Sequence, residues 1–387
     1  MKPRATLAAF LSAATRLLCA TLILAIAPHS FGKQLNPSKI VVFGASQESK
    51  CSDEQLDPVP TGISECYMFI APDLPPEYPL WPNLLAEYMG AELANYARAG
   101  AWSDTESYPL SPPVMGLKEQ VENYLEDQLE SGDDIAEAVH LISANVNDPT
   151  VNGGMIDELA KDKYIENMKN IVQALEAAGA RHIFYMDYRT SGRIALYYYI
   201  ANTPFVDREG LLGFIDGPPG CTKAESEAKD EDELQGEDRL DCSDDILTPL
   251  YKQMSDDTWD AISEISSVVK RAPVAGFLRE IEDNMAFYGF QPDLYGFCYR
   301  PLGPLFCLKE DVYGFSEIND GEGDGDPTQL VFEDAVHWGP RTYAIFAVIM
   351  QDLIRNSLNA KYHKKDKGKA ESQSLNFKRA YVRGRLQ

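Results

Sequence analysis

The chain has 387 residues, of which 60 are acidic and 35 are basic, and its formal net charge is −25. A charge this negative argues against nucleic acid as a partner and against stable association with anionic membranes, because both carry negative charge themselves. The length suits one large domain or two small ones, so the order of the predicted elements has to decide between them.

Residues 1–32 have the pattern of a secretory signal peptide. Basic residues at Lys2, Arg4 and Arg16 accompany an almost wholly apolar stretch from Leu17 to Ala27, which is short for a membrane span. Small residues near the end of this segment offer a cleavage site for a signal peptidase. The alternative is a membrane anchor. We expect residues 1–32 to be removed and the mature protein to be secreted.

The six cysteines beyond this segment also fit an oxidising compartment, because they form an even set without a C-x-x-C motif. They fall in three couples that are close in sequence: Cys51 with Cys66, Cys221 with Cys242, and Cys298 with Cys307. Spacing alone does not fix the pairing. We expect three local disulfides.

Short apolar runs alternate with amphipathic stretches along the chain. The predicted strands begin at Ile40, Leu93, Val139 and His182, and the predicted helices are Trp81 to Gly90, Met115 to Leu129, about 156–175 and Arg341 to Leu358. This alternation is typical of βαβ units. It predicts one α/β domain over residues 33–360, a three-layer α/β/α sandwich around a parallel sheet.

Two segments interrupt the alternation. Residues from about 189 to 245 contain an aromatic run, a Pro/Gly turn and an acidic stretch, and we interpret them as a surface insertion held by Cys221 and Cys242. The alternative is a lid or a wall of the substrate site. The run from Asp320 to Asp326 imitates half of an EF-hand loop, but Val331 stands where calcium needs a glutamate, so we expect no metal there.

The last segment, residues 361–387, is basic and poor in apolar residues, unlike the acidic body of the chain. Such composition is typical of a disordered, solvated tail. The alternative is a contact with the cell wall or another polyanion. We expect this tail to be disordered.

A candidate nucleophile lies at the end of the first predicted strand, where Lys39 to Ser46 reads KIVVFGAS. A serine attacks an ester only when a base is within reach and a carboxylate orients that base. His140 and His182 begin buried strands, where a core histidine is expected. His337 lies in a predicted loop three residues after Asp334, a spacing that lets the carboxylate orient the imidazole.

Acyl transfer also needs hydrogen-bond donors for the developing oxyanion. Residues that follow neighbouring strands could supply them: the backbone N–H groups of Ser46 and Gly100 and the side-chain amide of Asn147. Each has a plainer interpretation, because Gly100 could be an ordinary turn glycine and Asn147 could simply end a strand.

Four segments together resemble the four sequence blocks of the SGNH, or GDSL-type, hydrolase family. The segments are Gly44 to Ser46, Asn95 to Ala101, Asn147 with Asp148, and Asp334 with His337. The stretches Trp81 to Gly90, Gln120 to Tyr124 and Val331 to Asp334 are similar to secreted eukaryotic members, a group that includes carbohydrate acetylesterases and lipases.

The resemblance implies a flavodoxin-like parallel sheet and ester hydrolysis without a metal or other cofactor. It assigns Ser46, His337 and Asp334 to catalysis, and Ser46, Gly100 and Asn147 to the oxyanion hole. The sequence departs from the family at Ala45, where Asp is usual, and at Asn145, where Gly is usual. The family's Asp supports the loop, so Ala45 predicts lower efficiency more than a different mechanism. The alternative is a non-catalytic binding protein on the same scaffold.

We expect the substrate to be a short acyl ester, such as acetyl, on a carbohydrate. Trp102 and the run Tyr197 to Tyr199 could stack on sugar rings, although packing in the core would also explain them. Trp102 and Asn145 are candidates for the substrate wall, and Asn145 would narrow the pocket. The acidic body disfavours anionic lipid surfaces. A lipase or phospholipase of the same family is the alternative.

Overall fold

The computed structural model describes twelve stretches of the chain, two of which are single residues. They are residues 37–49, 79–98, 101–105, 115–132, 134–143, 158–187, 252–272, 274, 276–290, 331, 338–359 and 376–385, with side chains lacking a description at 158–160, 282, 359 and 383–385. The predicted signal peptide, all the cysteines and the insertion from about 189 to 245 lie outside these residues.

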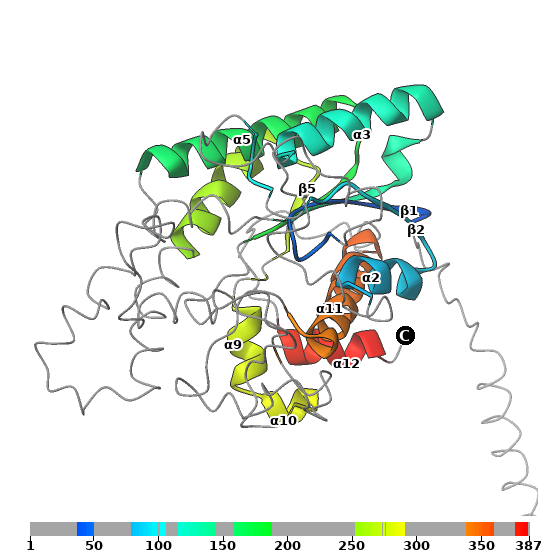
Figure 1. Ribbon diagram of the computed structural model, residues 1–387, viewed down its shortest axis with the longest axis vertical. Helices are drawn as coiled ribbons and strands as arrows, with labels where there is room; N and C mark the ends of the chain where they lie inside the picture. The colour runs from blue at the N-terminus through cyan, green and yellow to red at the C-terminus, as the bar shows by residue number, and fades with distance from the viewer. Residues whose placement is uncertain are drawn as a thin grey trace, which may run out of the picture.

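A five-stranded parallel sheet forms the centre of the described part and confirms the predicted α/β fold (Figure 1). Its strands are β1 (Lys39–Phe43), β2 (Glu92–Asn95), β3 (Val139–Ser143), β4 (His182–Met186) and β5 (Val269–Ala272). They lie in the order β2-β1-β3-β4-β5, and every neighbouring pair is parallel. This is the flavodoxin-like strand order, in which the chain changes direction across the sheet between β1 and β3.

Helices cover both faces of the sheet and complete the three layers. On one face lie α3 (Leu117–Ser131), α5 (Glu158–Ala177) and the helical residues 252–265; on the other lie α2 (Trp81–Met89), α11 (Pro340–Asn359) and α12 (Phe377–Arg385) (Figure 1). The short elements η2 (Ile135–Glu137), α9 (Phe277–Glu282) and α10 (Met285–Tyr288) connect them. Gly90 has φ of 62° and ends α2, as the sequence predicted, because this left-handed conformation favours glycine.

Aromatic side chains fill the layer between the sheet and α11. Trp81 and Phe346 lie 5.1 Å apart between ring centroids, and Phe346 lies 5.1 Å from Trp338. Phe277 packs against both Trp338 and Phe346, at 5.2 Å and 5.0 Å. Each of the four residues is almost completely buried. Burial of such large rings provides much of the driving force for packing α2 and α11 together.

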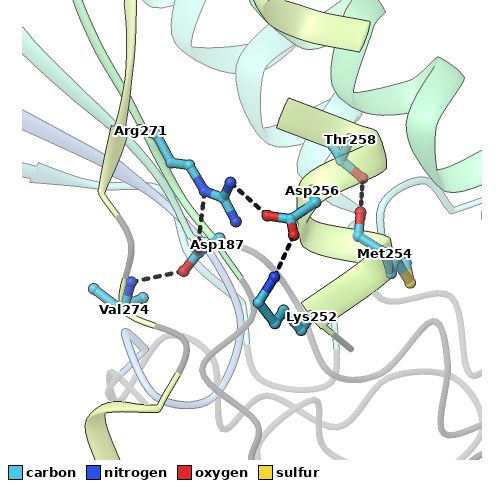
Figure 2. A network of polar contacts seen from close by, with 7 residues as sticks. All are labelled: Asp187, Lys252, Met254, Asp256, Thr258, Arg271 and Val274. Atoms are coloured by element: carbon cyan, nitrogen blue, oxygen red, sulfur yellow. Dashed lines mark hydrogen bonds and ion pairs between the residues drawn. The ribbon is translucent and has the colours of Figure 1, made fainter. Parts of the chain in front are cut away.

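A network of charged side chains joins β4 and β5 to the helical residues 252–265 (Figure 2). The buried Asp187 accepts hydrogen bonds from the Arg271 side chain at 2.9 Å and from the Val274 N–H at 2.6 Å. Arg271 also contacts Asp256 at 2.6 Å, and Lys252 contacts the other oxygen of Asp256 at 2.7 Å. Partial burial alone would raise the pKa of Asp256, but the bonds from Lys252 and Arg271 hold that pKa below its usual range.

The C-terminal segment differs from the prediction of a disordered tail. Residues 377–385 form α12, which packs on α11. Ala380 is fully buried, Phe377 lies 5.8 Å from Phe277, and Tyr381 lies 5.2 Å from Tyr288, measured between ring centroids. These apolar residues share one face of a short helix, which is enough to anchor it although the segment is basic. The prediction was therefore wrong for this part of the tail.

No helix among the described residues is both long enough and apolar enough to cross a membrane.

Candidate active site

The predicted site residues fall unevenly on the described part of the chain. Ser46 and Trp102 are described, whereas Gly100, Asn145, Asn147, Asp334 and His337 lie outside the described residues. Ala101 directly follows Gly100 and Trp338 directly follows His337, and these described neighbours, with the turn around Ser46, form the framework of the site.

Ser46 lies three residues after β1, at the carboxyl edge of the sheet. Phe43, the last residue of β1, is opposite Ile142 in β3, so β1 and β3 end side by side at this edge. This is the switch point of the sheet, where open α/β folds form crevices that bind ligands. Asn145 and Asn147 come two and four positions after Ser143, which ends β3.

The backbone around Ser46 makes a single helix-like turn. The Ala45 carbonyl accepts hydrogen bonds from the N–H groups of Glu48, at 3.1 Å, and Ser49, at 3.0 Å. Ser46 is therefore the first residue inside the turn, and it is partly exposed. The first N–H groups of such a turn have no backbone partner within the turn, and an oxyanion hole uses N–H groups of this kind.

Glu48 stabilises this turn from inside the protein. Its side chain is fully buried, and one carboxylate oxygen accepts a hydrogen bond from the Ala45 N–H at 3.0 Å. The other oxygen accepts a hydrogen bond from Trp81 Nε1 at 3.1 Å. A glutamate that reaches back to the N–H at the start of its own turn is half of a capping box. The acid-at-plus-three spacing was the sequence signal for this role, and the sequence analysis missed it.

Gly44 allows Glu48 to take that position. A Cβ atom on Gly44 would lie 2.6 Å from the Glu48 Oε2 atom and 2.9 Å from its Cγ atom, which is closer than side chains normally approach. The position of Glu48, two residues after the candidate nucleophile, thus favours glycine at position 44.

Gln120, on α3, fixes the other side of the same segment. Its side-chain oxygen accepts a hydrogen bond from the Gly44 N–H at 2.9 Å, and its Nε2 donates to the Gly44 carbonyl at 3.0 Å. A further bond from Nε2 reaches the Met115 carbonyl at 3.2 Å. Gln120 is fully buried. No local sequence signal reveals this contact, because it joins segments that are far apart in the chain.

The segment Asn95 to Ala101, which the sequence analysis took as the second block, lies against this turn. Asn95 donates from Nδ2 to the Glu48 carbonyl at 2.6 Å and accepts a hydrogen bond from the Ala97 N–H at 3.1 Å. The Arg98 N–H donates to the Gly44 carbonyl at 3.2 Å. Hydrogen bonds therefore join residues 95–98, which precede Gly100, to the turn that carries Ser46.

The residues after Gly100 are fixed to two helices. The carbonyl groups of Trp102 and Ser103 accept hydrogen bonds from the first turn of α3, at 2.8 Å and 3.1 Å. Asn167, on α5, donates from Nδ2 to the Ser103 hydroxyl and to the Asp104 carboxylate, both at 2.9 Å. Trp102 is half-buried. Residues 101–105 are therefore tied to both α3 and α5.

The residues on either side of Asp334 and His337 are held to each other. The Val331 carbonyl accepts hydrogen bonds from the Gly339 N–H at 2.8 Å and from the Thr342 hydroxyl at 2.7 Å. Trp338, which directly follows His337, is almost completely buried. Val331 and Gly339, which lie on either side of this part of the chain, are therefore next to each other at the start of α11.

That place connects to the Ser46 turn by two routes. Trp338 packs on Phe346, which packs on Trp81, whose indole N–H donates to Glu48. Separately, the Tyr343 hydroxyl, on α11, donates to the side-chain oxygen of Gln47 at 2.9 Å. Gln47 is the residue directly after Ser46, so the start of α11 lies beside the turn that carries the candidate nucleophile.

The two strand histidines have other surroundings. His140 is fully buried in β3, and its Nε2 lies 2.9 Å from the Tyr124 hydroxyl oxygen. Burial lowers its pKa to about 4, so the imidazole is neutral at neutral pH. Both His140 and His182 occupy the amino-terminal half of their strands, away from the edge at which Ser46 lies. The interpretation of His140 as a core histidine is confirmed.

Within the described ranges, no group of three or more His, Cys, Asp or Glu side chains is placed to hold a metal ion. Comparison with models of known protein families gives no match for this chain, and comparison with curated protein sequences gives no match either.

Proposed function

We propose that this protein is a secreted serine ester hydrolase of the SGNH type that removes short acyl groups, such as acetyl, from carbohydrate. Ser46 is the nucleophile, His337 is the base, and Asp334 orients His337. No metal or other cofactor takes part. The proposal rests on the four sequence segments and on the framework that surrounds Ser46.

The observation that carries the proposal is the double connection between the Ser46 turn and the residues next to His337. The Tyr343–Gln47 hydrogen bond and the packed series from Trp338 through Phe346 to Trp81 bring two segments together that are almost 300 residues apart in sequence. A base must lie within hydrogen-bond reach of its serine. The connection between Gln47, next to Ser46, and the segment that begins at Trp338, next to His337, supports the proposal.

The proposed reaction has two half-reactions. The Ser46 hydroxyl oxygen attacks the ester carbonyl carbon while His337 takes the hydroxyl proton; His337 then gives that proton to the departing alcohol oxygen, which leaves an acyl group on Ser46. Water attacks the acyl-enzyme while His337 takes a proton from it, and the proton returns to Ser46. The products are the free alcohol and a carboxylic acid.

The negative oxygen that forms in each half-reaction needs donors. We assign the Ser46 N–H, the Gly100 N–H and the Asn147 side-chain amide to this role. The supporting observations are the turn that begins at Ala45 and the anchoring of residues 101–105 to α3 and α5, since donors held by rigid elements do not have to reorganise during the reaction.

Carbohydrate is favoured as the alcohol part of the substrate. Trp102 comes two residues after Gly100 and is only half-buried, and an indole ring is suited to stacking on a sugar. The net charge of −25 disfavours anionic lipid surfaces. A short acyl group fits the narrowing that Asn145 would cause.

Hydrolysis of p-nitrophenyl acetate tests the reaction. The wild type is expected to turn over this ester and to be labelled at Ser46 by an organophosphonate probe, and Ser46→Ala is expected to lose both properties. Ser263→Ala is the matched control, because this exposed serine bonds only to a backbone carbonyl of its own helix. A folded protein without turnover or labelling would favour the non-catalytic binding protein.

The substrate class is tested separately. Rates on p-nitrophenyl acetate are compared with rates on the decanoate ester, and acetylated xylo-oligosaccharides are compared with phospholipid vesicles. We expect preference for acetate and for the oligosaccharides. Preference for decanoate and vesicles would instead identify a lipase or phospholipase.

A further inference from the structure

We propose that Glu48 is the positioning residue for Ser46: its carboxylate locks the turn that carries the nucleophile by binding the Ala45 N–H and Trp81 Nε1 at the same time. This inference rests on the proposed function, because it concerns the support of that function's nucleophile. Glu48 does not touch the substrate in this scheme and transfers no proton.

The Glu48 side chain is fully buried and accepts hydrogen bonds from two donors. A fully buried carboxylate is stable only when hydrogen bonds replace its lost water. Each oxygen of Glu48 has an N–H donor, at 3.0 Å from Ala45 and at 3.1 Å from Trp81. The two donors come from different elements, the turn itself and α2. Glu48 therefore fixes the orientation of the turn relative to the helix layer.

The turn that carries Ser46 has only half of a capping box. A capping box normally has a polar side chain at its first residue and a Glu three residues later. Here Ala45 has no polar side chain, so only the glutamate half remains. Ser46 and Gln47 are the two residues enclosed between these ends. Of the two contacts of a capping box, only the one from Glu48 holds the ends of this turn together.

The Ala45 N–H and the Trp81 Nε1–H both require an acceptor. A glutamine at position 48 has the same shape, but its amide nitrogen would have to face either the Ala45 N–H or the Trp81 N–H. One N–H would then be buried without an acceptor, which is unfavourable. In Trp81→Phe the indole donor is absent, so the glutamine nitrogen can face the ring and its oxygen can still accept from Ala45.

This difference gives a specific test. Four proteins are compared with the wild type: Glu48→Gln, Trp81→Phe, the double variant, and the control Glu280→Gln. Glu280 accepts hydrogen bonds from Asn284 and Tyr288 through one oxygen, which glutamine retains, and its helix α9 makes no contact with the Ser46 turn among the described hydrogen bonds. For each protein we would measure kcat and KM on p-nitrophenyl acetate, the rate of organophosphonate labelling, and hydrogen exchange of peptides covering residues 40–49.

Glu48→Gln is expected to lower kcat and the labelling rate about tenfold or more with KM nearly unchanged, because a nucleophile displaced by less than an ångström reacts more slowly without losing substrate contacts. Exchange in peptides covering residues 40–49 should increase. The double variant should be less impaired than the product of the two single effects. A merely structural role for Glu48 would lower stability without this specific decrease in kcat and in the labelling rate at unchanged KM.

The inference is overturned if Glu48→Gln keeps kcat and labelling within about twofold of Glu280→Gln, or if the single effects multiply. Failure of the proposed function gives a different result, since the wild type itself would then show neither turnover nor labelling. The exchange measurement still reports in that case whether Glu48 holds the turn, because it needs no substrate.

Discussion

Gln120 and Gly44 are joined by two hydrogen bonds, from the Gly44 N–H to Oε1 at 2.9 Å and from Nε2 to the Gly44 carbonyl at 3.0 Å, although 76 residues separate them in sequence. The side-chain amide of Gln120 thus completes the backbone of Gly44 as a neighbouring strand would. This contact ties α3 to the end of β1, two residues before the candidate nucleophile.

Substitution of Gln120 should destabilise the protein when the new side chain cannot both accept a hydrogen bond from the Gly44 N–H and donate one to the Gly44 carbonyl. In Gln120→Leu the Gly44 N–H loses its acceptor and the Gly44 carbonyl keeps only the bond from the Arg98 N–H, and we expect a loss of about 1–3 kcal/mol in the free energy of unfolding. Gln120→Glu retains one acceptor but places a second oxygen against the carbonyls of Gly44 and Met115, so it should be at least as destabilising. Denaturant unfolding at pH 7 measures both, and equal stability of all three proteins would refute the assignment.

Gly44→Ala should disturb Glu48, because the added Cβ atom would approach the Glu48 carboxylate to 2.6 Å. We expect a loss of about 1–3 kcal/mol in stability, which is typical of forcing an extra methyl group into a packed site. The informative comparison is the same substitution in a Glu48→Ala background, where the obstacle is absent. The effect of Gly44→Ala should be much smaller there, and an unchanged effect would show that another contact is responsible.

His140 should make stability depend on pH. Burial lowers its pKa from 6.5 to about 4, so between these values the unfolded chain binds a proton that the folded protein does not. Its contribution to stability is therefore fully present above pH 6.5 and is lost as the pH falls toward 4, by on the order of 3 kcal/mol.

The variant His140→Gln tests this dependence, since it keeps a polar group for the Tyr124 hydroxyl and cannot be protonated. The stability advantage of the wild type over the variant, measured by denaturant unfolding, should shrink as the pH falls from 7 to 4.5. His182→Gln serves as the comparison at the neighbouring strand. A wild-type advantage that stays constant across this range would contradict the prediction.

In the charge network that follows β4, loss of a buried ion pair should reduce the free energy of unfolding much more than loss of an exposed one. Arg271→Met leaves the buried Asp187 carboxylate without its main partner, and a loss of about 3–5 kcal/mol is expected. Lys252→Met removes an exposed partner of Asp256, whose side chain keeps its contact with Arg271, and should change stability by about 0–1 kcal/mol. Unfolding measured at pH 7 compares the two, and similar losses would show that the network is not organised around Asp187.

The helices and strands that were predicted correctly are those in which the local sequence has a clear pattern of apolar residues or a glycine stop. The apolar run from Ile40 and the helix that begins at Trp81 and stops at Gly90 lie where the sequence predicts them. The helix predicted from Arg341 to Leu358 extends from Pro340 to Asn359. In each case the periodicity of buried side chains, or a glycine in a left-handed conformation, acts within a few residues and can be read locally.

The strand β5 (Val269–Ala272) was not predicted, because Lys270 and Arg271 interrupt its apolar pattern. In the folded protein Arg271 is neutralised by Asp187 and Asp256, and β4 supplies hydrogen bonds along the strand. Tertiary contacts thus made a strand from residues whose own preference is weak.

The sequence by itself also suggested which residues could do chemistry, but the support around Ser46 came only from the tertiary structure. Glu48 lies within the turn, yet its role depends on Trp81 as a second donor and on burial that excludes water. Gln120 and Tyr343 reach the same turn from distant helices. Residue type determines which hydrogen bonds a side chain can make, whereas packing of the whole chain determines which partner is within reach.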